Sequence, residues 1–194
     1  MVTGKLDGKG NIKRVIKTDS VSAGGHTMDC RIVRKPAFDV VGKSRKFAEA
    51  GGESLAEIPR FWDEFMKDRK GLRAVVGLIG NESSRTVTGS QSLGVSMCRA
   101  GAEEFTYAVG VEAAVREIPK DFEVIHVPAA RWAIFDSIGP MPGAIQDLTK
   151  RIINEWFPGT GYAHPEYELE VYLPGNPGSN DYHCQVWIHV NEKL

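Results

Sequence analysis

The sequence predicts an α+β protein built from two similar halves, residues 29–120 and 121–194, around a central ligand cleft. The first observation is that the order strand, helix, strand, strand occurs twice. The second is that Lys35-Pro36-Ala37 and Val127-Pro128-Ala129 occupy matching places in the two copies, which indicates internal duplication. Because one helix covers only one face of its sheet, two adjacent copies would leave a cleft lined by the uncovered faces.

Residues 1–28 precede the first predicted strand, and we expect them to form a flexible or loosely docked segment. The segment carries four lysines and one arginine among glycines and serines, and its main apolar pair is Val15-Ile16. So little apolar surface does not favour a packed element. A basic arm that contacts nucleic acid is the alternative, although the segment is too short for a helix-turn-helix.

The first half begins with a predicted strand over Cys30–Gly42, in which Pro36 indicates an edge position or a bend. A loop over Glu49–Ser54 leads to a helix whose first turn holds Pro59 and whose apolar stripe is Phe61, Trp62, Phe65 and Met66. The pattern of Leu72–Gly80 fits a short helix or a buried loop equally. Strands over Ser92–Cys98 and Phe105–Ala114 complete the half.

The second half repeats this order. Residues 122–135 form an extended segment that contains Pro128, and a loop leads to a helix from about Ala144 to Trp156 with a clear 3.6-residue apolar period. Helix-breaking residues over 157–161 end it. Two strands, Tyr167–Leu173 and Tyr182–Val190, close the chain.

The last two strands each have one apolar face and one mixed face. Leu169, Val171 and Leu173 alternate with Glu168, Glu170 and Tyr172; in the second strand Cys184, Val186, Ile188 and Val190 alternate with His183, Gln185, Trp187 and His189. An ordinary half-solvated hairpin would explain this pattern. The wall of a ligand pocket would also explain it, since such sites combine apolar lining with a few convergent polar groups.

Composition excludes several classes of function. The 24 basic and 25 acidic residues balance, so charge gives no reason to expect binding to nucleic acid or to an anionic membrane. No apolar run is long enough to span a bilayer, and no signal peptide is present, so we expect a cytoplasmic protein whose three cysteines are reduced. His183 and His189 lie too far apart along a strand to share a metal ion, and nucleotide-binding glycine motifs are absent. We therefore expect no metal and no cofactor.

A series of segments resembles the GyrI-like effector-binding domain, the ligand-binding module also found in AraC-type and MerR-type transcription regulators. The resemblance spans about residues 29–192 and rests on Pro59-Arg60-Phe61-Trp62, on 107–112, on 129–135, on Glu155-Trp156-Phe157-Pro158 and on the final strands. It implies a pseudo-twofold pair of βαββ modules around a central pocket. It also implies an acidic pocket residue at Glu170 and a second acid at Glu112, with amphipathic, often cationic aromatic compounds as ligands.

The predicted site centres on Glu170, Tyr172 and Trp187. The carboxylate can neutralise a bound cation, and the neighbouring aromatic rings can stack against it. Glu112 joins it if a bulge at Gly110 resets the strand's alternation relative to Tyr107; Glu168 is expected at a solvated rim. Trp62 and Trp132 are either pocket walls or core, and Trp156 is structural. The full set of predicted ligand-binding residues is Glu170, Tyr172, Trp187, Glu112, Tyr107, Trp62, Trp132 and Gln185.

Two functions fit these residues. The first is a standalone cytoplasmic protein that binds bulky aromatic, cationic small molecules. The second is a hydrolase without metal or cofactor, in which Glu170 and Glu112 act as general acid and base on a cyclopropane-bearing genotoxin, as the resemblance to some family members implies. A protein-binding inhibitor is a third possibility that no exposed apolar stripe supports. The sequence contains no DNA-binding domain, so we expect no direct binding to nucleic acid.

Overall fold

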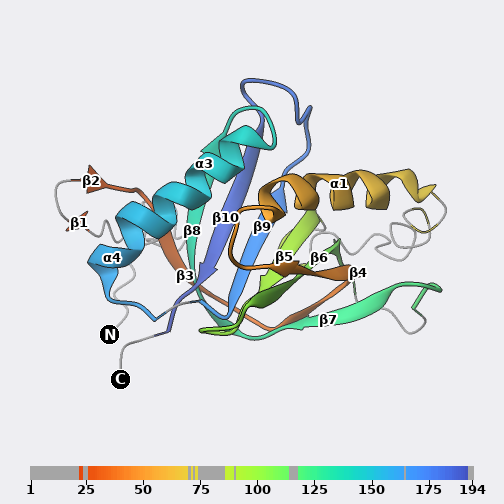
Figure 1. Ribbon diagram of the computed structural model, residues 1–194, viewed down its shortest axis with the longest axis horizontal. Helices are drawn as coiled ribbons and strands as arrows, with labels where there is room; N and C mark the ends of the chain where they lie inside the picture. The colour runs from red at the N-terminus through yellow and green to blue at the C-terminus, as the bar shows by residue number, and fades with distance from the viewer. Residues whose placement is uncertain are drawn as a thin grey trace, which may run out of the picture.

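The computed structural model describes residues 22–23, 26–69, 71, 73, 86–89, 91–113, 118–163 and 165–191. One eight-stranded antiparallel sheet carries the fold, and its helices lie on one side of it (Figure 1). The sheet strands are β3 (Arg31–Lys35), β4 (Phe38–Ala48), β5 (Ser92–Met97), β6 (Glu104–Glu112), β7 (Glu123–Val127), β8 (Ala130–Ile138), β9 (Tyr167–Tyr172) and β10 (His183–His189). The predicted α+β class is confirmed.

The strand order across the sheet is β3-β8-β10-β9-β5-β6-β4-β7. If β3, β4, β5 and β6 are matched in order with β7, β8, β9 and β10, this order is the same from either edge. Each half also lends one strand to the other, because β3 pairs with β8 and β7 pairs with β4. Duplication of the chain stays a prediction, and this symmetric order is the one that it would produce.

The described residues of each half form four strands rather than the three that the sequence predicted. The chain passes from β3 to β4 through Pro36-Ala37 and from β7 to β8 through Pro128-Ala129. Proline cannot donate a ladder hydrogen bond, so a strand that continued through it would lose a pairing there. The predicted single strands around Pro36 and Pro128 are therefore wrong: each is two strands with different neighbours.

Two helical segments cover part of the sheet. The first is α1 (Ser54–Lys67), which packs on β4 and β6; the second is continuous and comprises α3 (Gly143–Arg151), a π-helical turn η2 (Ile152–Trp156) and α4 (Phe157–Thr160). Helix α3 packs on β8 and β10. Gly161, with φ of 70°, ends the second helix one turn later than predicted. In the sheet order, β9 and β5 lie between the strands under α3 and the strands under α1.

Pro59 lies in the second turn of α1 rather than in its first turn, because the helix begins five residues earlier, at Ser54. Proline has no N–H to donate to the carbonyl of Leu55, four residues before it. The side chain of Gln146 on α3 donates to that carbonyl instead, with Nε2 and the oxygen 2.9 Å apart. This hydrogen bond gives the Leu55 carbonyl oxygen a donor and links α3 to α1.

The face of the sheet opposite the helices is a second core. Apolar side chains from both halves pack together there, and most are fully buried; they include Val40, Leu93, Val95, Val127, Trp132, Leu169, Val171 and Trp187. The expected cleft on the uncovered faces is therefore wrong, because these faces are filled by side chains.

Two predicted segments lie largely outside the described residues. Of the N-terminal segment 1–28, the structure describes the paired strands β1 (Ser22–Ala23) and β2 (His26–Thr27) and the buried Met28. Met28 packs with Cys30 in the core beneath α3. Segment 72–80, apart from Arg73, is outside the described residues as well. No helix among the residues described is long and apolar enough to cross a membrane.

Candidate functional site

A cavity of about 1140 Å³ lies on the helix side of the sheet, between α1 and α3. Strands β5 and β9 contribute Ser92, Ser96, Glu168, Glu170 and Tyr172 to its lining. Large apolar side chains from the helices line it as well and stay accessible: Leu55 is 46% exposed, Met66 51% and Ile153 52%. Exposed apolar side chains around a cavity are typical of a site that covers an apolar ligand.

Glu170 is held on the cavity's sheet side by two tyrosines. The hydroxyl of Tyr107 on β6 donates a short hydrogen bond to Oε2 of Glu170, and the hydroxyl of Tyr172 donates to the same oxygen at 2.9 Å. Trp62 on α1 donates from Nε1 to the hydroxyl oxygen of Tyr107 at 2.8 Å. Since a tyrosine has one O–H proton, this contact leaves the Tyr107 proton directed at the carboxylate. The Trp62 and Tyr172 rings meet edge to face, with centroids 4.7 Å apart.

Gly94 on β5 makes room for this arrangement. It pairs with Glu170 across the sheet, and a Cβ added at Gly94 would lie 2.1 Å from the Tyr107 hydroxyl oxygen and 2.6 Å from Oε2 of Glu170. No side chain larger than hydrogen fits between them. A glycine in the middle of a strand often indicates that another group approaches the backbone closely. Gly94 was therefore the sequence signal for the close approach of Tyr107 and Glu170.

Burial shifts the acidity of the whole group. Removal from water raises the pKa of Glu170, while the hydrogen bonds from Tyr107 and Tyr172 act in the opposite direction. Burial and the nearby Glu170 carboxylate raise the pKa of Tyr107 and of Tyr172 well above that of a free tyrosine. Both tyrosines therefore remain hydrogen-bond donors across the physiological pH range.

Glu168 also lines the cavity, so its expected position at a solvated rim is wrong. Burial, together with the negative charges of Glu170 and Glu49, raises the pKa of Glu168 to about 7. Its neighbour across the sheet is Ser96, and Cys98 lines the cavity beside it. Burial raises the pKa of Cys98 to about 12, so this cysteine stays a neutral thiol.

Glu112 does not reach the cavity. Strand β6 pairs with β4 in unbroken register from Glu104 to Glu112, so no bulge at Gly110 changes its alternation. The Glu112 carboxylate accepts hydrogen bonds from the backbone N–H of Val87 at 2.8 Å and from the N–H and hydroxyl of Thr88, both at 2.7 Å. Its contacts anchor segment 86–88. The predicted convergence of Glu112 with Glu170, on which the acid–base hypothesis depended, is wrong.

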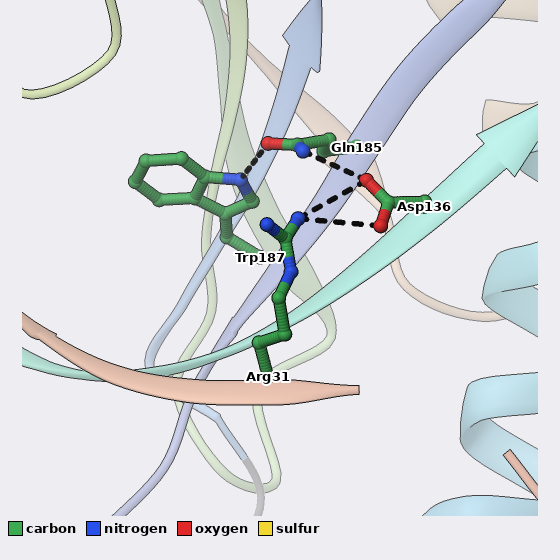
Figure 2. Close-up of polar contacts among 4 residues, drawn as sticks. All are labelled: Arg31, Asp136, Gln185 and Trp187. Atoms are coloured by element: carbon green, nitrogen blue, oxygen red, sulfur yellow. Dashed lines mark hydrogen bonds and ion pairs between the residues drawn. The ribbon is translucent and has the colours of Figure 1, made fainter. Parts of the chain in front are cut away.

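Trp187 and Gln185 lie on the far side of the sheet from Glu170. Strand β10 pairs Val186, not Trp187, with Glu170. Figure 2 shows the hydrogen bonds there: the Trp187 ring N–H donates to the side-chain oxygen of Gln185, and the guanidinium of Arg31 donates to the Asp136 carboxylate. The amide nitrogen of Gln185 donates to the same carboxylate, with a nitrogen–oxygen distance of 2.7 Å. Trp187 is 3% exposed, and the prediction that it shares a face with Glu170 is wrong.

Trp132 is core rather than pocket wall. It is completely buried on the face opposite the helices, with its ring 6.3 Å from that of Trp187. Of the eight predicted ligand-binding residues, the structure brings four to the cavity: Trp62, Tyr107, Glu170 and Tyr172. Trp156, predicted to be structural, is buried against Phe135.

The charged residues that line the cavity are mostly acidic. Among the residues that the structure describes, four are carboxylates and Lys150 is the lone cation; the carboxylates are Glu49, Asp63, Glu168 and Glu170. Within the described part of the chain, no group of three or more His, Cys, Asp or Glu side chains is arranged to hold a metal ion. Acidic groups and aromatic rings at one apolar cavity favour an organic cation over an anion.

Comparison with known proteins gives one family and several similar structures. A family model described as the GyrI-like small molecule binding domain matches residues 28–191. No curated protein matches the chain.

Three solved structures share the fold at low sequence identity. The protein SAV2435, bound to tetraphenylphosphonium, has a TM-score of 0.69 and 15% identity, over 84% of this chain and 94% of that one. A candidate transcription regulation protein from Staphylococcus aureus MU50 has a TM-score of 0.67 and 16% identity, over 85% and 99%. An integron cassette protein from Vibrio cholerae has a TM-score of 0.61 and 14% identity, over 84% and 95%.

Proposed function

The chain belongs to the family of GyrI-like small-molecule-binding domains, and from this premise we propose that its cavity binds bulky aromatic cations. The observation that carries the proposal is the Glu170 carboxylate, fixed by Tyr107 and Tyr172 within a largely apolar cavity. A preorganised carboxylate attracts a cation without first having to be ordered. The neighbouring rings of Trp62 and Tyr172 add cation–π attraction and stacking surface.

The size of the cavity supports a bulky ligand. Its volume of about 1140 Å³ lies slightly above the range of about 300–1,000 Å³ that is usual for small-molecule sites. The binding of tetraphenylphosphonium by a protein of similar fold agrees with this choice of ligand class. We further propose that the protein works in the cytoplasm and does not itself contact DNA, in agreement with its formal net charge of −1.

Titration calorimetry with tetraphenylphosphonium tests the proposal, with triphenylphosphine oxide as a neutral comparison. We expect the cation to bind the wild-type protein and the Glu170→Gln variant to bind it about tenfold or more weakly, on the scale of a lost charge-assisted contact. Affinity for the neutral compound should change little. Glu123→Gln, a change of the same kind at an exposed site on β7, should behave as wild type.

Two results would contradict the proposal. One is the absence of binding by a protein that is folded at the assay temperature. The other is an equal loss of affinity for the cation and the neutral compound in Glu170→Gln, which would mean that the residue shapes the cavity without selecting charge. The melting temperature of each variant, measured in parallel, separates both results from misfolding.

A further inference from the structure

Strand β9 presents a second carboxylate to the cavity. Glu168 and Glu170 are two residues apart and line the same cavity. Alternate residues of a strand lie about 7 Å apart along it. The two positions face different surroundings across β5, since Glu170 pairs with Gly94 and Glu168 pairs with Ser96.

The two carboxylates differ in their partners. Glu170 accepts two hydroxyl hydrogen bonds. The Glu168 carboxylate has no hydrogen bond or ion pair with any residue that the structure describes, although it is largely removed from water. A carboxylate held away from water without a partner is costly, and a ligand's positive charge would remove that cost.

Nothing positively charged among the described residues compensates Glu168. The charged groups that interact with it are Glu170 on its own strand and Glu49 after β4, and both are acidic. The Cys98 thiol next to β5 is neutral. On the helices, Asp63 adds a negative charge, and Lys150 lies within 4.0 Å of Asp147.

We infer that the cavity takes aromatic dications, with Glu170 facing one positive charge of the ligand and Glu168 facing a second about 7 Å away. The inference rests on the proposed function and specifies its ligand class. Burial raises the pKa of Glu168 to about 7. The second charge is therefore recognised fully only above that pH, because a protonated Glu168 offers no negative charge.

Two permanently charged probes of the same shape isolate this second contact. The dication 1,1′-dimethyl-4,4′-bipyridinium carries its charges roughly 7 Å apart, about the spacing of alternate strand residues. The monocation 1-methyl-4-phenylpyridinium replaces one charged ring by phenyl. Because neither probe titrates, any pH dependence of their affinity belongs to the protein.

Calorimetric titration of both probes at pH 6 and pH 8 gives the test. We expect wild type to bind the dication at least about tenfold more tightly than the monocation at pH 8, and this ratio to fall at pH 6. Glu168→Gln should remove the preference at both pH values while retaining affinity for the monocation. Glu123→Gln should keep the wild-type ratio and its pH dependence.

The possible failures are distinguishable. Binding of tetraphenylphosphonium with no preference between the two probes would overturn this inference and leave the proposed function standing. An equal loss of affinity for both probes in a folded Glu168→Gln variant would overturn it too, since Glu168 would then only shape the cavity. Failure of all three cations to bind the folded wild-type protein would remove the proposed function and this inference together.

Discussion

Replacement of Gly94 by alanine should disrupt the floor of the cavity with the smallest possible change. The added Cβ would lie 2.1 Å from the Tyr107 hydroxyl oxygen, whereas ordinary contact begins at 3.4 Å. Tyr107 would therefore have to move by about 1.3 Å, the difference between these distances. It is 1% exposed and packs edge to face against Phe47, so it has little room to move.

The size of the effect follows from the two ways in which the clash can be relieved. If Tyr107 stays in the core, overpacking should reduce the free energy of unfolding by about 1–3 kcal/mol. For a protein of this length each kcal/mol corresponds to a fall of roughly 2–4 °C in melting temperature. If instead the Glu170 side chain turns away and Tyr107 shifts into the space that it leaves, less stability is lost, but the carboxylate leaves its tyrosines and cation affinity should fall about tenfold.

Thermal unfolding and titration with tetraphenylphosphonium distinguish these two outcomes. Gly143→Ala is the matched control, because a Cβ at Gly143, the first residue of α3, would meet no atom within 4 Å. Alanine there should leave stability unchanged or raise it by up to about 1 kcal/mol. If Gly94→Ala matches wild type in both stability and affinity, then Tyr107, Glu170 and Gly94 are not packed as described.

Other changes probe the remaining carboxylates and the far face. In the Glu168→Gln background, Glu170→Gln should also abolish the pH dependence of tetraphenylphosphonium binding, because burial raises the pKa of Glu170 and affinity should therefore rise with pH through that pKa while Glu170 is present. Calorimetry at several pH values would detect a slope that persists. Glu168→Gln should stabilise the protein above pH 7 and not at pH 4. The raised pKa means that the folded state binds a proton more tightly than the unfolded state, so wild-type stability falls as pH rises from 4.5 to about 7, by on the order of 3 kcal/mol. Denaturation curves in which Glu168→Gln gains no stability over wild type above pH 7 would contradict this. Glu112→Ala should cost about 2–4 kcal/mol in chemical denaturation, because two backbone N–H groups of segment 86–88 lose their acceptor, and should leave ligand affinity unchanged in calorimetry. Trp187→Ala should cost about 3–5 kcal/mol of stability as a core truncation; a stable variant with selectively weakened ligand binding would return Trp187 to the site.

The elements with strong periodicity could be predicted from the sequence. The apolar stripe of the second helix places Ile145, Ile152 and Trp156 in the core, and all three are buried. Alternation likewise predicts the buried Leu169 and Val171 of β9. These assignments succeed because burial of one face imposes a period that each element carries in its own residues.

The stripe of α1 shows where local pattern stops being sufficient. Phe61 and Phe65 are buried beneath the helix, whereas Trp62 and Met66 line the cavity. All four belong to one continuous apolar stripe, so periodicity cannot divide core from cavity wall. That division depends on where α3 lies, and α3 comes from the other half of the chain.

The prediction puts Trp187 on the wrong face because the register between β9 and β10 cannot be predicted from either strand alone. In the pairing of β9 with β10, the numbers of partnered residues sum to 356, as for Tyr172 with Cys184. Trp187 would share the face of Glu170 if that sum were odd, which requires a shift of one residue. A two-residue turn would fix the register by its own geometry, but residues 173–182 form a longer connection that does not.

The register instead follows from which face each strand must bury. Cys184, Val186 and Ile188 belong to the core under α3, and Leu169 and Val171 to the core on the opposite face. The two apolar faces of the final strands therefore point in opposite directions, so Glu168, Glu170 and Tyr172 lie beside the apolar face of β10. This offset brings the carboxylates to an apolar cavity, where burial raises their pKa and gives a cationic ligand something to neutralise.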